Sequence, residues 1–126
     1  MQLVLLVALG GAIGSVGRYL IGLHIAARYG SAYPWATLTV NVVGAFVMGL
    51  VVEWIARRLG GSAEARALLA SGLLGGFTTF SAFAYDVSVL VERGGWIASL
   101  GYVLLSVIGS ILALYAGLVL ARTLLP

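Results

Sequence analysis

Four long apolar blocks, joined by short polar connections, constrain the fold of this chain more than any other feature. They cover about residues 3–23, 35–55, 67–91 and 96–120, and each approaches or exceeds the roughly 20 residues that a helix needs to cross a bilayer. The alternation of about ten residues that marks a membrane-spanning strand is absent. We therefore predict an all-α membrane protein with four transmembrane helices in a single domain, residues 1–126.

The connections between the blocks are too short to hold a soluble domain, so the chain must act within or across the membrane. The composition agrees, because 62% of the residues are hydrophobic and 9% are charged, against roughly 25% charged in soluble domains. The first block lacks a basic leading region and is read as a retained span. The absence of cysteine excludes disulfides, thiolate metal sites and thiol catalysis.

The basic residues are all arginines, scattered at or near the span ends, and form no patch for nucleic acid. Four spans place both termini on one side of the membrane. That side carries Arg57, Arg58, Arg66 and Arg122, and the other side carries Arg28 and Arg93. This bias favours cytoplasmic termini only weakly, so both orientations are compatible with the sequence. Thirteen kilodaltons are too few to enclose a wide pore, and a homodimer, antiparallel if both orientations occur, is expected.

The third block is interrupted near its middle by glycines and hydroxyl residues. Glycine lowers helix stability, and adjacent threonines add crowding and offer hydroxyls that hydrogen-bond to the backbone. We predict a broken helix between Gly75 and Thr79. Broken helices at membrane depth line a pathway or hold an ion.

Polar side chains inside the other spans allow two interpretations each. Asn41 must face protein or water, either as a clamp between helices or in a pore wall. Tyr102, Ser106 and Ser110 recur every four residues and form a stripe on one helix face. Packing is the favoured interpretation of the stripe by itself, and a file of hydrogen-bond donors is the alternative.

Three further residues within the spans have possible roles beside an ion. Arg18 lies about five residues from the predicted end of the first span, where it either snorkels to the interface or concentrates anions in a vestibule. Phe80 and Phe83 share one face after the break, where they either pack in the core or contact an anion through electropositive ring edges. No nucleophile, base and orienting group occur together, so we do not expect an enzyme.

Taken together, these motifs resemble those of the CrcB/Fluc family of bacterial fluoride channels over essentially the whole chain. Residues 72–83 are similar to the glycine, threonine and phenylalanine signature of the family, residues 37–41 to its second-helix motif, and residues 14–18 to its first-helix glycine and arginine. The resemblance implies passive export of cytoplasmic fluoride across the cell membrane. It also implies an antiparallel, dual-topology homodimer with two pores.

The resemblance further implies two kinds of ion site, one for a cation and one for the conducted anion. By motif, the backbone carbonyls of Gly75 and Thr78 from two subunits would hold a structural sodium ion at the two-fold axis. Residues matching the pore or its polar track are Phe80, Phe83, Asn41, Tyr102, Thr79, Ser81, Ser106 and Ser110. The chain departs from the family at Asp86, where a glutamate is frequent.

Two other classes of protein remain as alternatives. A small multidrug exporter also has four helices, but it needs a carboxylate in the first span, and this span contains Arg18 and no acid. A helical assembly subunit would explain pairs of small residues four apart, such as Gly10 and Gly14. It would not explain the hydroxyls and glycines in the middle of the third span.

Overall fold

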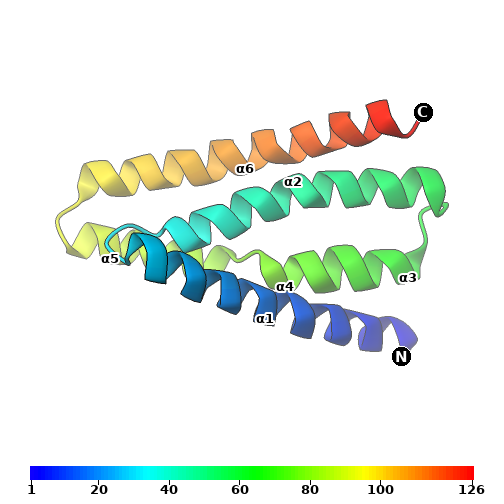
Figure 1. Cartoon of the computed structure of the whole chain (residues 1–126), viewed down its shortest axis with the longest axis horizontal. Coiled ribbons are helices and arrows are strands. Elements are labelled where there is room, and N and C mark those ends of the chain that lie inside the picture. The colour runs from blue at the N-terminus through cyan, green and yellow to red at the C-terminus, as the bar shows by residue number, and fades with distance from the viewer.

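The computed structural model describes residues 1–126 and is a bundle of helices without strands. Three helices are long and continuous: α1 (Gln2–Tyr29), α2 (Trp35–Arg58) and α6 (Trp96–Leu124). The segment Ala63–Glu92 completes the four helices that are long and apolar enough to cross a membrane. The predicted all-α fold with four spans is confirmed, and both termini lie at one end of the bundle (Figure 1).

The third span is built from several short helical pieces. A short α3 (Ala63–Ala65) leads into the π-helical segment η1 (Arg66–Leu74) and then α4 (Gly75–Phe77). The helix resumes as α5 (Phe80–Glu92) after two extended residues, and the uncoiled segment between α4 and α5 is visible in Figure 1. The interruption predicted between Gly75 and Thr79 is therefore present.

The helices approach closely where glycines face each other's backbones. Gly10 and Gly14 of α1 are buried against η1, and a Cβ at Gly14 would collide with the Leu73 carbonyl oxygen and lie 2.9 Å from the Phe77 amide nitrogen. Gly49 and Gly117 make the corresponding contact between α2 and α6. These contacts match the use of small residues for close packing in membranes.

The first helix is longer than the apolar block that predicted it. It continues to Tyr29, past residue 23, so Arg18 lies about three turns from the C-terminal end at 3.6 residues per turn. Arg18 is therefore farther from the end of the helix than from the end of the apolar block, which lies about five residues away. Its side chain reaches the third span instead, as described below.

Candidate functional site

A groove of about 550 Å³ opens beside the interruption of the third span, between α2, α5 and α6. We call it the break groove. It brings together eight of the eleven predicted site residues: Asn41, Gly75, Thr78, Thr79, Phe80, Phe83, Ser106 and Ser110. Arg18, Ser81 and Tyr102 do not line it. The remaining wall is mostly apolar, from residues including Met48, Val107, Ile111 and Leu114.

Asn41 holds the break open through two hydrogen bonds to one residue. Its Nδ2 donates to the Thr79 carbonyl oxygen at 2.9 Å, and the Thr79 amide donates to Asn41 Oδ1 at 2.8 Å. In a continuous α-helix that amide would donate to the carbonyl of Gly75, which is therefore released. Asn41 is thus a clamp between helices, and the second Nδ2 hydrogen has no partner within the chain.

Thr79 starts the second half of the span as its N-cap. Its backbone is extended (φ −152°, ψ 125°), and its Oγ1 accepts a hydrogen bond of 3.2 Å from the Ala82 amide, the usual arrangement of an N-cap threonine. That amide would bond to the Thr78 carbonyl in a continuous helix. The carbonyls of Gly75 and Thr78 therefore both lose their amide donors to side chains.

Arg18 supplies the donor for a third carbonyl at the break. Its Nε donates to the Gly76 carbonyl oxygen at 3.2 Å. In a continuous helix that oxygen would accept from the backbone amide of Phe80. Arg18 also lines a separate cavity of about 250 Å³ together with Thr37 and Thr79. A positive charge therefore stands directly behind the interrupted backbone.

The two phenylalanines after the break differ sharply in exposure. Phe83 is 9% exposed and belongs to the core, whereas Phe80 is 79% exposed in the single chain. Their ring centroids are 5.4 Å apart. Core packing therefore describes Phe83 but not Phe80, whose ring stands at the open edge of the break groove.

The polar stripe on α6 runs from the core into the groove. Tyr102 is fully buried and its hydroxyl donates to Asp86 Oδ2 at 3.1 Å. Ser106 is also buried, lines the groove, and its Oγ has no hydrogen-bond partner. Ser110 lines the groove farther along the same face. A buried hydroxyl without a partner costs free energy unless a ligand or a water molecule hydrogen-bonds to it. The Ser106 hydroxyl is therefore available to an ion or a water molecule in the groove.

Ser81 lies outside the groove. It is exposed, and its Oγ is 3.3 Å from Thr79 Oγ1. The Thr79 hydroxyl is therefore the polar group that links Ser81 to the lining of the break groove.

A row of aromatic rings connects the groove to a second cavity. The Phe83 centroid is 5.3 Å from that of Tyr102, which is 5.8 Å from that of Tyr33. Tyr33 and Asp86 line a cavity of about 180 Å³ beside the connection between α1 and α2. Burial raises the pKa of the Tyr33 hydroxyl above its usual value of 10.0.

Sequence reasoning missed Gly44 as part of the site. Gly44 is buried, lines the groove, and a Cβ there would collide with Thr78 Cγ2. Its position three residues after Asn41 places it on the same helix face, which is a signal that the sequence contained. The contact between Arg18 and Gly76 had no comparable signal, because the two residues are far apart in the chain.

Comparison with known proteins adds independent information. The family described as "CrcB-like protein, Camphor Resistance (CrcB)" matches residues 5–118. A relative from Chelativorans sp. (strain BNC1) is 59% identical, over 96% of this chain and 97% of its own length. Relatives from Agrobacterium fabrum (strain C58 / ATCC 33970) and Rhizobium meliloti (strain 1021) are 54% and 50% identical, over 94% and 97% of this chain and 95% and 98% of theirs. All three bear the name "Fluoride-specific ion channel FluC".

Proposed function

The chain belongs to the CrcB-like family, and from this premise we propose that it is a fluoride-specific channel that passively exports cytoplasmic fluoride. It is a multi-pass protein of the cell membrane, with four spans and relatives named as channels. Export down the electrochemical gradient would lower the toxicity of fluoride that enters as the neutral acid. No catalytic step is needed for this activity.

The observation that carries the proposal is the break groove itself. It combines an aromatic ring edge at Phe80, the unused Nδ2 hydrogen of Asn41 and the unpartnered hydroxyl of Ser106. Fluoride is small and strongly hydrated, so it must exchange its water for several short contacts. Neutral donors and ring edges offer such contacts without holding the anion as tightly as a buried full charge, which permits it to leave.

The working channel is an antiparallel homodimer. Irregular backbone at membrane depth is tolerated only where protein or water covers it, yet Gly75 is exposed and Phe80 is 79% exposed in the single chain. A second copy placed over the break would cover both residues. The weak charge difference between the two ends of the bundle supports insertion in both orientations.

The dimer would hold a structural sodium ion at its centre. The released carbonyls of Gly75 and Thr78 fit a hard cation, because such ions prefer oxygen ligands. Two carbonyls are too few for a closed cage, and two antiparallel chains would bring four together. In this arrangement the cation joins the subunits and is not transported.

Fluoride efflux from proteoliposomes tests the channel function. Liposomes loaded with potassium fluoride are treated with valinomycin to release the counter-charge, and external fluoride is read with an electrode. We expect fast, valinomycin-dependent fluoride loss and negligible chloride loss in matched vesicles. A folded protein that releases no fluoride, or releases chloride equally, would refute the proposal.

The sodium site has its own test. Replacing sodium by potassium or N-methylglucamine during purification should lower the dimer fraction measured by chemical cross-linking and slow the fluoride flux. An unchanged dimer fraction and flux after exhaustive sodium removal would remove the basis for a structural cation.

A further inference from the structure

A second groove lies at the end of the bundle that carries both termini. It has a volume of about 270 Å³ and is entirely apolar, lined by Leu50, Val51, Trp54, Ala121, Leu124 and Leu125. We call it the terminal groove. Its α2 and α6 residues lie nearer the end of the bundle than those of the break groove, and the two grooves share no lining residue.

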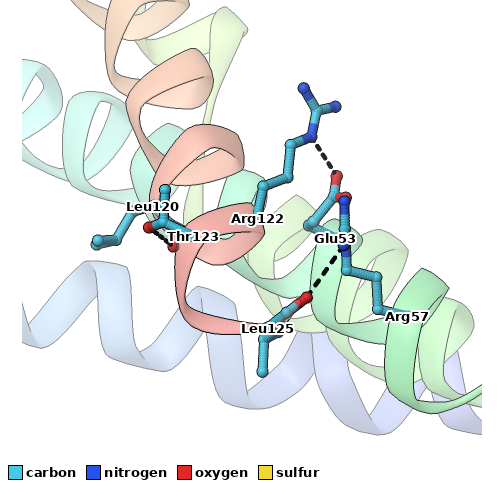
Figure 2. A network of polar contacts seen from close by, with 6 residues as sticks. All are labelled: Glu53, Arg57, Leu120, Arg122, Thr123 and Leu125. Atoms are coloured by element: carbon cyan, nitrogen blue, oxygen red, sulfur yellow. Dashed lines mark hydrogen bonds and ion pairs between the residues drawn. The ribbon is translucent and has the colours of Figure 1, made fainter.

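Two arginines are fixed at the rim of this groove. Glu53 Oε1 accepts a hydrogen bond from Arg57 Nε at 2.6 Å, and Glu53 Oε2 forms an ion pair with Arg122 Nε at 3.1 Å. Arg57 Nη1 also donates to the Leu125 carbonyl at 3.0 Å, and Leu125 lines the groove. Figure 2 shows both guanidinium groups beside the last turn of α6, with the terminal nitrogens of Arg122 pointing away from Glu53.

The charges at this rim do not balance. Glu53 is shared by two guanidinium groups, whose side chains are 39% exposed at Arg57 and 53% exposed at Arg122. Arg58, the next residue of α2, is exposed and adds positive charge at the same end of the helix. One carboxylate between two guanidinium groups leaves positive charge at the rim, together with unused N–H donors arranged for a phosphate.

The apolar groove and the charged rim also match the layers of a bilayer. Tryptophan concentrates at the membrane interface, and Trp54 lines the groove at the end of a spanning helix. Arginines near helix ends place their charge at headgroup level. The groove therefore lies where acyl chains begin, and the guanidinium groups lie where phosphates are found.

We propose that the terminal groove is a binding site for an anionic phospholipid, with an acyl chain between α2 and α6 and the phosphate on Arg122 and Arg57. A helix from a second copy would also fill an apolar groove, but it would cover two guanidinium groups that share one carboxylate, which is unfavourable. A phosphate diester with an anionic headgroup supplies the missing negative charge. This inference rests on the four spans and does not depend on which ion the protein conducts.

Native mass spectrometry of the delipidated protein tests the site by titration with phosphatidylglycerol and with phosphatidylcholine of the same acyl chains. Each arginine at a membrane surface contributes about fivefold in affinity for an anionic lipid. We expect tighter binding of phosphatidylglycerol, weakened about fivefold by Arg122→Gln and further by the Arg57→Gln, Arg122→Gln double variant. Arg93→Gln is the matched control, since Arg93 is exposed at the other end of the bundle.

The acyl part of the site has a separate variant. Leu124→Trp adds bulk inside the terminal groove and should weaken both lipids, whereas Leu104→Trp, an exposed position elsewhere on α6, should weaken neither. Equal affinity for the two lipids, or an equal loss in Arg93→Gln and Arg122→Gln, would overturn the proposal. Because the readout is lipid binding, a protein that conducts fluoride normally can still fail this test.

Discussion

Replacing Asn41 by alanine tests the link between the helix break and function. The change removes the acceptor for the Thr79 amide and the donor for the Thr79 carbonyl, bonds of 2.8 and 2.9 Å at a partly buried position. Hydrogen bonds contribute about 0.5–1.5 kcal/mol each to stability, and measured values in membranes centre near 0.6 kcal/mol. We expect Asn41→Ala to lower the free energy of unfolding by about 1–3 kcal/mol.

The same substitution should suppress conduction for two reasons. Without its clamp, the Thr79 amide can return to the Gly75 carbonyl, which would close the break and withdraw that oxygen from a cation. The pore would also lose the second Nδ2 hydrogen. A hydrogen bond to an ion is worth about 1.5–3 kcal/mol, which corresponds to about a ten- to hundredfold lower rate.

Stability is measured by equilibrium unfolding in mixed dodecyl maltoside and SDS micelles, and conduction by fluoride efflux from proteoliposomes. Thr39→Ala is the matched control, because Thr39 is an exposed polar residue two positions away in α2. Both quantities should stay at the wild-type level in the control. If Asn41→Ala also unfolds and conducts like the wild type, the two hydrogen bonds do not hold the break and our account of the site is wrong.

Three further substitutions have separate expected outcomes. Phe80→Ile should abolish fluoride efflux without lowering the stability of the single chain, because Phe80 is 79% exposed there; equal loss in Tyr115→Ile, another exposed aromatic, would contradict a specific role. Gly14→Ala should destabilise the protein by about 1–3 kcal/mol or more through overpacking, since its Cβ would collide with the Leu73 carbonyl. Gly22→Ala, with open space around the added methyl group, should unfold like the wild type. Thr79→Ala should cost about 1 kcal/mol in the same assay as the N-cap of α5 is lost, and Thr79→Ser should restore most of it; failure of serine to do so would argue against the cap.

The match between predicted and observed site residues has a local cause. The interruption lies among glycines and threonines, whose low helix propensity and local hydrogen bonds act within one turn of helix. Residues 75–79 therefore predicted the break without knowledge of the helices packed around them. Helical periodicity also placed Ser106 and Ser110 on one face, and both line the break groove. The carbonyl cage, the pore and the antiparallel dimer remain predictions.

Other features depended on helices that are distant in sequence. Tyr102 continues the stripe of Ser106 and Ser110 by periodicity, yet it is fully buried and bonded to Asp86. Phe80 and Phe83 share a chemical type and a predicted face, but only Phe83 has neighbours that bury it. Such differences depend on which helix stands opposite each residue, and spacing along one helix carries no information about that.

The sequence by itself determined the four spans and the break, because hydrophobic length and backbone preference are local properties. Only the tertiary structure decided how the break is stabilised. Asn41 takes the amide of Thr79, and Arg18 takes the carbonyl of Gly76, across separations of 38 and 58 residues. A freed backbone group must find a partner inside the membrane, and the packing of α1 and α2 against the third span selected which side chains reached it.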